Sequence, residues 1–443
     1  MKPSTNYPPE PATSVIPSDV TAKSDQALTV AIVGFGTVGS SVARILSENA
    51  PAGLRLTHIC NRNVERKRVD WLPGSVRWTQ EFTDILSSDV DVVVEVIGGL
   101  EPAADWIRSA LKSGKSVVTA NKQVIARHGT ELVRLALRHK QHIAFGASVA
   151  GGVPVISGLQ EGLAGDELVK LCGILNGTCN YILTRIESAG ISFGDALLEA
   201  QKLGFAEADP SDDIDGFDAR AKLTILARTG LRVSANPLDI LARSISGIEP
   251  VDFDYAKLLD CTIRQISRAE ITAGSLLASV QPTLVHGSSP LARVEGGQNL
   301  VMSTGKFGGE TVFAGHGAGG NPTAVAIVSD LIAIARSRQV NTVALEPERE
   351  VPSLPVSFDF TSRHYLRFTV KDEPGIIASL ALIFCRSGIN IDSVFQKPGY
   401  PKDKLPFVIT LEPCPASVVE EALRHIAPLA FLVKPCVSLP ILD

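Results

Sequence analysis

This sequence of 443 residues lacks long apolar runs and dense positive charge, and each absence excludes a class of protein. A membrane-spanning helix needs roughly 18 uninterrupted apolar residues. The best candidate, 90–97, is interrupted by Asp91 and Glu95. The net charge is −5 and no long run of lysine or arginine occurs, which argues against nucleic-acid binding. Integral membrane, collagen and coiled-coil proteins are excluded as well.

Paired cysteines are also lacking. The seven cysteines are isolated from one another, with no CxxC pair and no zinc-ligand spacing. An odd number in a long chain without a secretory signal predicts reduced thiols and a cytoplasmic protein. The sequence gives no confident metal site.

What is present is an ordinary globular composition, 45% hydrophobic and 20% charged. This length predicts about three domains. Residues 1–27 hold five prolines among serine, threonine and aspartate, with no apolar segment of a signal peptide. We expect a disordered tail, because it has too little apolar surface to offset the entropy of ordering.

A glycine motif follows the first apolar run. Leu28–Val33 is typical of a strand, and residues 40–47 have the apolar spacing of a helix. Between them lie the residues that we expect to hold a dinucleotide: Gly34, Phe35, Gly36, Thr37, Val38 and Gly39. Strand, G-x-G-x-x-G and helix in this order predict a Rossmann-type domain of α/β class with the phosphates at the helix N-terminus. The alternative is a glycine-rich turn in another α/β protein.

The end of the next expected strand, 55–60, bears on the choice of cofactor. An NAD-preferring fold usually has an acidic residue there to bind the ribose 2′-hydroxyl. Here Arg62 follows, then the basic segment 66–68. Guanidinium groups suit a 2′-phosphate, which favours NADP over NAD, although 66–68 is equally typical of a solvated helix face.

Further strand–helix units continue the pattern. Strands are expected over 90–97 and 116–119, with a helix over 102–112 between them. Asn121 and Lys122 then stand where the last of these strands ends. Ligands of doubly wound sheets bind at the carboxyl ends of strands, so both are candidates to contact cofactor or substrate. The alternative for Lys122 is a surface lysine that begins a helix.

An acidic segment marks the middle of the chain. It has six acids in the twelve residues from Glu207 to Asp218, and their spacing fits a calcium loop poorly. It is either a solvated loop or a site for a cationic group such as a substrate ammonium. Asp218 and Lys222 are four residues apart and share one helix face. They form either an exposed ion pair or a catalytic lysine held by a carboxylate.

The chain resembles the homoserine dehydrogenase family from about 28 to 331. The segments that carry the resemblance are GFGTVG, VIGG, TANKQVIA, GGVPVI, GILNGTCNYIL, GFAEADPSDDIDGFDARAKLTILA and GHGAGGNPTAVAIVSDL. The resemblance implies reversible NAD(P)-dependent reduction of L-aspartate 4-semialdehyde to L-homoserine, a step of threonine, methionine and isoleucine biosynthesis. It also implies a homodimer or homotetramer.

The resemblance further implies roles for particular residues. The catalytic residues are Lys222 and Asp218, assisted by Lys122. The substrate residues are Glu207, Asp213, Asn176, Gly177 and Thr178. To the glycine motif and Arg62 it adds Asn121, Lys122 and Gly317 as cofactor-binding residues, with Gly317 in a loop that begins a helix returning to the nucleotide domain. The alternative for that loop is no ligand contact.

One departure from the family concerns a monovalent cation. Relatives commonly have a glutamate after the aromatic residue of the strand that we expect to run through 145–149, and here Gly146 takes its place. The remaining ligands implied by the resemblance are backbone carbonyls near Val149 and Gly151. Loss of the carboxylate makes sodium binding doubtful. A second departure, Cys179 in place of Thr or Ser, keeps a small side chain.

The C-terminal region, 363–443, has the element order βαββαβ of a ferredoxin-like fold and resembles an ACT domain. Asp372 and Gly375, in a D-x-P-G turn, and Asn390 are its expected effector contacts. The resemblance implies an amino-acid effector, with L-threonine the first expectation. The alternative is a dimerisation module that binds nothing.

The expected organisation has five parts. They are the tail, a nucleotide-binding domain of 28–147 with 319–345, an α+β substrate-binding, catalytic and dimerisation domain of 148–318, a linker of 346–362, and the ACT domain. Two other functions remain open. One is a hydroxy-acid oxidoreductase of the phosphoglycerate dehydrogenase type, and the other is a non-catalytic amino-acid sensor.

Overall fold

The computed structural model describes residues 27–442 apart from 50, 52, 273 and 340–350. The expected disordered tail therefore lies outside the described residues, except for Ala27. Within the described residues, no helix is long and apolar enough to cross a membrane. All seven cysteines are free thiols.

A six-stranded parallel sheet forms the first half of the molecule. Its order is β3 (Arg77–Thr79), β2 (Leu54–Cys60), β1 (Leu28–Val33), β4 (Val92–Glu95), β5 (Ser116–Thr119) and β6 (Ile143–Ala144). This is the strand order of a dinucleotide-binding fold. The short, apolar and β-branched strands follow from burial on both faces. The Rossmann-type half predicted from the glycine motif is confirmed.

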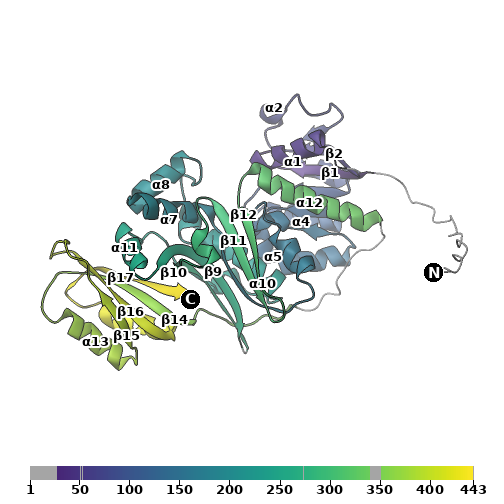
Figure 1. Cartoon of the computed structure of the whole chain (residues 1–443). Coiled ribbons are helices and arrows are strands. Elements are labelled where there is room, and N and C mark those ends of the chain that lie inside the picture. The colour runs from purple at the N-terminus through teal and green to yellow at the C-terminus, as the bar shows by residue number, and fades with distance from the viewer. Residues whose placement is uncertain (1–26, 50, 52, 273, 340–350, 443) are drawn as a thin grey trace, which may run out of the picture.

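Helices cover both faces of this sheet. Successive side chains of β1 alternate between them: Val30 and Ile32 join one buried cluster, and Ala31 and Val33 another. One face carries α1 (Thr37–Glu48) and α12 (Gly320–Gln339), which lie side by side (Figure 1). The other carries α3 (Phe82–Ser87), α4 (Ala103–Lys112) and α5 (Lys122–Arg138). A helix from late in the sequence thus completes the nucleotide-binding half.

The second sheet is mixed and has eleven strands. Along its path lie β12 (Gly309–His316), β11 (Gln298–Gly305), β7 (Leu168–Ile174), β9 (Cys261–Thr272), β10 (Ser275–His286), β17 (Leu432–Leu442), β14 (Thr361–Val370), β16 (Leu405–Pro415) and β15 (Ile391–Phe395). Two short strands, β8 (Leu241–Ala242) and β13 (Val356–Ser357), also pair with β10. The path therefore runs without a break from residues 148–318, which the sequence predicts to bind substrate and which are called the substrate-binding half below, into the C-terminal region.

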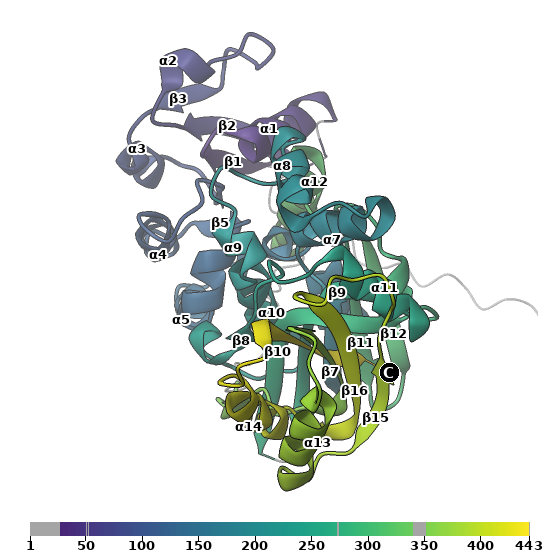
Figure 2. The ribbon, with the colours of Figure 1, turned by 90° about the vertical axis from the view of Figure 1, so that its left-hand side faces the viewer.

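Helices between these strands build the walls around the site. They are α7 (Gly177–Ala189), α8 (Phe193–Lys202), α9 (Ser211–Ile214), α10 (Phe217–Gly230) and α11 (Pro250–Leu258). In Figure 2, α9 and α10 lie between the nucleotide-binding half and the second sheet. The α10 helix contacts both α5 and β9, so it joins the two halves. This position brings the acidic segment of the sequence to the boundary between them.

The C-terminal region contains β14, α13 (Ile376–Arg386), β15, β16, α14 (Ala416–Ile426) and β17, which is the order βαββαβ. It is not set apart from the rest. The last strand runs parallel to β10, with Leu284 opposite Ile441 and Val285 opposite Leu442. Tyr365 of β14 shares a buried cluster with side chains of α7 and α11. Sheet and core are therefore continuous across the boundary expected near 363.

Two expectations about connecting segments differ from the structure. The strand expected through 145–149 ends at Ala144, and Gly146–Ser148 forms a short 3-10 helix. The Ser148 amide donates to the Phe145 carbonyl at 2.9 Å, which closes the turn. In the expected linker, residues 351–360 pack against the second sheet, because Pro352 and Pro355 accept backbone hydrogen bonds and β13 pairs with β10.

Candidate active site

The nucleotide-binding half supplies one lysine to the site. The chain leaves β5 at Thr119 and turns directly into α5. Asn121 caps this helix, because its side-chain oxygen accepts from the Val124 amide at 3.2 Å. Lys122 is consequently the first residue of the helix, at the carboxyl edge of the sheet.

The substrate-binding half supplies a second lysine and a carboxylate. Gly216, at φ +80°, ends the acidic loop in a left-handed conformation that favours glycine, and α10 begins at the next residue. Asp218 lies in the first turn of α10, and Lys222 lies one turn further on. Their spacing allows an ion pair of 2.7 Å between Nζ of Lys222 and Oδ2 of Asp218.

The two lysines meet on the same carboxylate. Nζ of Lys122 lies 2.6 Å from Oδ1 of Asp218. The side chain of Asp218 is 3% exposed, that of Lys222 13% and that of Lys122 38%. Lys222 also donates to the backbone carbonyl of Leu175 at 2.9 Å. A buried carboxylate is thus held between two ammonium groups, one from each half of the molecule.

Asn176 links this pair to a second carboxylate. Its amide nitrogen donates to Asp213 at 2.6 Å and to Asp218 at 2.9 Å. Its oxygen accepts from the Cys179 amide at 2.8 Å and so caps α7. Asn176 therefore fixes the spacing of the two acids while its own position is fixed by the helix that it caps.

The charges of the cluster are mutually stabilised. Burial opposes ionisation of Asp218, but the two ammonium groups outweigh it and hold the pKa of that carboxyl well below its usual range. Burial likewise opposes the charge of Lys122, yet Asp218 raises the pKa of its ammonium above the ordinary value. Burial raises the pKa of Asp213, which Asn176 only partly offsets. The raised pKa of Lys122 favours its charged form, and the raised pKa of Asp213 shows that its charge is less well compensated than that of Asp218.

The glycine loop fits a dinucleotide. A Cβ on Gly34 would lie 2.8 Å from the Val96 carbonyl oxygen, and one on Gly39 would lie 2.0 Å from the Gly34 carbonyl oxygen. These two positions must be glycine for strand, loop and helix to pack. A Cβ on Gly36 would instead meet nothing within 4 Å. Gly36 precedes α1 as its N-cap, so open space lies where a pyrophosphate would approach the helix amides.

Comparison with known families agrees with this geometry. The family model "Homoserine dehydrogenase, NAD binding domain" matches residues 34–146, and the model "Homoserine dehydrogenase" matches residues 154–332. The homoserine dehydrogenase of Bacillus subtilis is 36% identical over 394 residues, which cover 87% of this chain and 91% of that protein. The chain belongs to the homoserine dehydrogenase family. The predicted oxidoreductase function is thereby confirmed.

Solved structures of homoserine dehydrogenases agree. The enzyme from Thiobacillus denitrificans has a TM-score of 0.86 at 32% identity and covers 94% of this chain and 99% of its own. A hyperthermophilic archaeal homoserine dehydrogenase in complex with NADPH has a TM-score of 0.61 at 28% identity, over 70% of this chain and 98% of its own. Likeness to the first extends through the C-terminal region, and to the second through a smaller part of the chain.

The other residues that the resemblance to homoserine dehydrogenases assigns to the substrate lie around the cluster of Asp218 and the two lysines. They differ in how exposed they are. Gly177 begins α7, where a Cβ would lie 2.7 Å from the Gly297 carbonyl oxygen. The Thr178 hydroxyl donates to the Phe205 carbonyl at 2.7 Å and so fixes the turn before Glu207. The side chain of Glu207 is exposed, and only its backbone carbonyl is bonded, by Gln201. The structure therefore does not bring Glu207 to Asp218.

The residues assigned to the cofactor line the edge of the first sheet. Arg62 is exposed just beyond β2. Asn61 beside it accepts from the Phe35 amide at 3.1 Å and so ties the end of β2 to the glycine loop. Gly317 contacts the loop after β6, because a Cβ on Gly151 would lie 2.6 Å from its carbonyl oxygen. Val149 of the same loop is fully buried.

The sequence did not predict a buried hydrogen-bond network next to Lys122, at the start of α5. Glu95, which the sequence shows only as a charge interrupting an apolar run, ends β4 and is buried. It accepts from the Thr119 hydroxyl at 2.6 Å and from the Ile97 amide at 2.9 Å. Thr119 in turn accepts from the Asn121 amide, and Asn121 donates to the Gly99 carbonyl at 2.7 Å. A lone acid in a buried strand was the available signal.

A second missed acid lies beside Gly146. Asp330 of α12 accepts from the Gly146 amide at 2.9 Å, and burial raises the pKa of this carboxyl to about 6. A Cβ on Gly146 would lie 3.0 Å from Asp330. Residue 146 lacks a carboxylate, but the carboxylate of Asp330, on α12, lies beside this position. Within the described part of the chain, no three or more His, Cys, Asp or Glu side chains are grouped to hold a metal ion.

The three residues assigned to an effector lie toward opposite ends of strand β14. Asp372 and Gly375 follow its last residue, Val370, whereas Asn390 lies near the other end, where His364 pairs with Leu411. Gly375, at φ +95°, precedes α13. The Asp372 amide donates to the Lys402 carbonyl at 2.6 Å. Asn390, just before β15, donates to the Glu412 carboxylate at 3.0 Å.

Proposed function

We propose that the cluster at Asp218 reduces the aldehyde of L-aspartate 4-semialdehyde to the alcohol of L-homoserine, and catalyses the reverse reaction. The observation that carries this is the meeting of Lys122 and Lys222 on one buried carboxylate. An aldehyde oxygen that gains a hydride at its carbon becomes an alkoxide and needs both positive charge and a proton. Ammonium groups supply both.

Lys222 is the main proton donor or relay in this proposal. Supporting this role are its low exposure and its two fixed contacts, to Asp218 and to the Leu175 carbonyl. Lys122 assists by stabilising negative charge on the same oxygen, and its greater exposure suits a group that faces the cofactor side. Nicotinamide, when bound, supplies the hydride. The balance is one aldehyde, one hydride and one proton giving one alcohol.

The substrate amino group is bound by acids in this proposal. Asp213 is the candidate that contacts the ammonium, because Asn176 holds it beside the catalytic pair. Thr178 and Gly177 shape the turn around it. Glu207 is a second acid for this group, and its exposed position requires the 205–207 turn to move toward the substrate.

We further propose NADP as the cofactor. The glycine loop 34–39, Asn121 and Gly317 are its expected contacts, and Arg62 is placed to meet a 2′-phosphate beyond β2. Asn61, in the position where an acid would bind a ribose hydroxyl, is neutral and already accepts from Phe35. The archaeal homoserine dehydrogenase was solved in complex with NADPH, and this likeness supports the proposal.

For the C-terminal region we propose an ACT domain that binds an amino acid, L-threonine first, with Asp372 and Gly375 after β14 and Asn390 toward the other end of that strand as candidate contacts. Its support is the βαββαβ order and the glycine turn that exposes the start of α13. We also propose a homodimer or homotetramer. The second sheet ends in strands β12 and β15, and Phe307 beside β12 is 84% exposed, as expected of edges that pair with another copy.

One assay separates this function from the alternatives. NADPH consumption is followed with L-aspartate 4-semialdehyde and, separately, with hydroxypyruvate phosphate. We expect turnover with the first alone. Turnover with the second alone would favour a phosphoglycerate-type dehydrogenase, and turnover with neither would favour a sensor. Comparison of NADPH with NADH in the same assay tests the assignment of Arg62.

The regulatory proposal is tested on the intact enzyme. L-Threonine is titrated into the assay and, in parallel, into a calorimeter cell. We expect inhibition together with heat of binding. If neither occurs up to high millimolar threonine, the effector proposal fails while the catalytic one stands. Sedimentation of the same sample measures the oligomeric state.

A further inference from the structure

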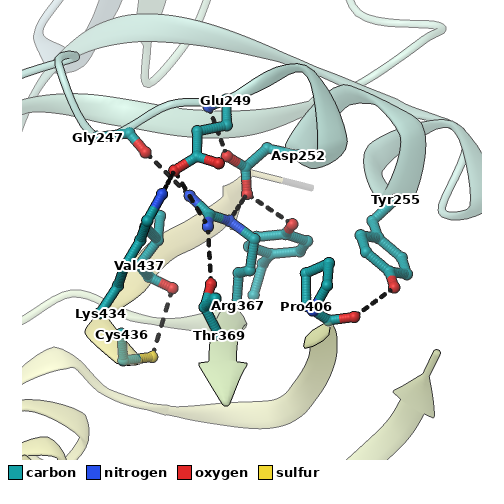
Figure 3. Close-up of polar contacts among 11 residues, drawn as sticks. Gly247, Glu249, Asp252, Tyr255, Arg367, Thr369, Pro406, Lys434, Cys436 and Val437 are labelled. Atoms are coloured by element: carbon teal, nitrogen blue, oxygen red, sulfur yellow. Dashed lines mark hydrogen bonds and ion pairs between the residues drawn. The ribbon is translucent and has the colours of Figure 1, made fainter. Parts of the chain in front are cut away.

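A buried ion pair joins the C-terminal region to the substrate-binding half. Nε of Arg367, on β14, lies 2.6 Å from Oδ1 of Asp252, on α11. Their side chains are 2% and 0% exposed. The hydroxyl of Tyr365 donates to the same carboxylate oxygen at 2.8 Å. Figure 3 shows the guanidinium of Arg367 enclosed between the two regions.

The same guanidinium reaches the loop that precedes α11. Nη2 of Arg367 donates to the Gly247 carbonyl at 3.0 Å, and Nη1 lies 3.6 Å from the Glu249 carboxylate. Asp252 meanwhile accepts from the Glu249 amide at 2.8 Å, which closes the first turn of α11. Arg367 therefore contacts the chain before α11 at the Gly247 carbonyl and at the Glu249 carboxylate (Figure 3). It also contacts α11 itself, through Asp252.

The loop in turn contacts the short helix that carries Asp213. The Ile245 amide donates to the Ile214 carbonyl at 3.1 Å. Ile245 and Ile248 are buried in one cluster with Ile214, and this cluster continues into Tyr365. Ile214 is the last residue of α9 and follows Asp213 directly. An unbroken series of contacts thus runs from Arg367 to Asp213.

Other contacts also keep the C-terminal region in place, among them the hydrogen bond from Tyr255 to the Pro406 carbonyl and the ion pair of Lys434 with Glu249. Strand β17 is hydrogen-bonded to β10, and Arg243, just after β8, forms an ion pair with Glu420 of α14. Separating the regions would expose the shared cluster and leave Asp252 and Arg367 as unpaired charges, which is strongly unfavourable. The region is therefore attached rigidly.

We propose that Arg367 is a positioning residue for the substrate site, holding the 244–248 loop and, through it, the α9 turn that presents Asp213 to the substrate ammonium. This rests on the proposed function, because Asp213 contacts the substrate only there. It adds a role for the C-terminal region that needs no effector: the region forms the outer support of the substrate pocket. The nucleotide loop lies at the far side of the molecule and is not part of this series.

The test uses the full chain with two variants. Arg367→Lys keeps a charge for Asp252 but loses the guanidinium fork that also reaches Gly247. The double variant Arg367→Met with Asp252→Asn removes both charges together, so no buried charge is left unpaired. The matched control is Arg363→Lys, which lies on the same strand and pairs with Asp392 inside the C-terminal region. Thermal unfolding confirms that each variant is folded.

The first measurement is steady-state kinetics. We expect the KM for L-aspartate 4-semialdehyde to rise about tenfold in both Arg367 variants, the size of one lost, oriented hydrogen bond. The KM for NADPH should stay within about twofold, since the cofactor site is remote. The control should match the parent enzyme. A folded Arg367 variant with an unchanged KM for the semialdehyde would overturn the proposal.

The second measurement does not depend on activity. Amide hydrogen exchange should accelerate in residues 211–216 and 244–248 of the Arg367 variants, but not in the nucleotide-binding half or in the control. Unchanged exchange at 211–216, or acceleration spread evenly over the chain, would overturn the positioning role. If the parent enzyme fails to reduce the semialdehyde, the proposed function falls, and exchange at 211–216 still decides whether Arg367 holds α9.

Discussion

Two buried aspartates invite comparison, because they have almost the same burial and opposite uses. Asp218 binds two lysines where the halves meet, and Asp252 binds an arginine and a tyrosine where the C-terminal region docks. At Asp218 the partners retain some exposure, up to 38% for Lys122. At Asp252 the partner Arg367 is 2% exposed.

The chemistry of the partners explains the difference. A lysine ammonium can release its proton and take it back, and its three donors can turn toward a new acceptor. A guanidinium stays charged, and its planar fork engages several fixed acceptors at once. The first arrangement suits proton transfer, and the second suits holding surfaces together. The identity and exposure of the cation therefore separate a site for chemistry from a site for attachment.

The largest expected effect comes from removing the proposed proton donor. Lys222→Met should lower kcat by roughly 10²–10⁴-fold, the usual contribution of general acid catalysis. Lys122→Met is the matched comparison and should lower kcat less, because Lys222 still reaches the oxygen. The unfolding curve and NADPH binding of Lys222→Met should match those of the parent enzyme. Turnover of Lys222→Met near the parent value would refute the assignment.

Removing the acid at the attachment site should act on stability instead. Asp252→Asn leaves the buried Arg367 with only its longer contact to Glu249, which we expect to lower the free energy of unfolding by about 3–5 kcal/mol in urea titrations. Asp218→Asn should cost less stability, because Lys122 can turn to solvent, but should abolish most activity. Equal losses of stability in the two variants would remove the contrast drawn between the sites.

A smaller effect is expected beside Lys122, at the start of α5. Glu95→Ala removes the acceptor for Thr119 and for the Ile97 amide, so both the turn at 97–99 and the start of α5 lose support. The KM for NADPH should rise about tenfold, as for one or two lost buried hydrogen bonds. Glu95→Gln keeps one acceptor oxygen, so its KM for NADPH should lie between those of the parent enzyme and Glu95→Ala. An unaltered NADPH KM in a folded Glu95→Ala enzyme would contradict this.

The last effect is absent at neutral pH and appears only on acidification, as a pH dependence at the C-terminal interface. Burial lowers the pKa of His364 to about 4, with a further contribution from Arg243. The unfolded value is higher, so the unfolded chain takes up a proton first as pH falls. Stability from neutral His364 is complete above about pH 6.5 and is lost toward pH 4, by at most about 1.4 kcal/mol per pH unit. His364→Gln should unfold with a shallower dependence in that window; identical slopes would count against it.

The sequence was informative where the signal is local. The glycine motif, the apolar strands and the i, i+4 pair of Asp218 and Lys222 each depend on neighbouring residues, and each takes the expected form. The 3-10 turn at Gly146 was missed because it depends on Asp330, which lies on α12 and 184 residues away. Contacts between residues this far apart produce no recognisable pattern of spacing in the sequence.

The same reason explains what was missed in the site and the C-terminal region. Glu95 is visible as an isolated acid, but its partner Thr119 belongs to the next strand. The pairing of β17 with β10 depends on packing between surfaces far apart in the chain. The meeting of Lys122 with Asp218 was anticipated only through family resemblance, since no rule of spacing relates residues on two domains.

The position of Lys122 and Lys222 on opposite sides of one carboxylate has a mechanical consequence. A motion that parts the two halves pulls the first lysine from Asp218 while the second stays on its own helix. The three charged groups are therefore all in contact only while the two halves stay together. Any change that separates the two halves would leave Asp218 with Lys222 alone, so the number of ammonium groups on this carboxylate depends on the fit between the halves.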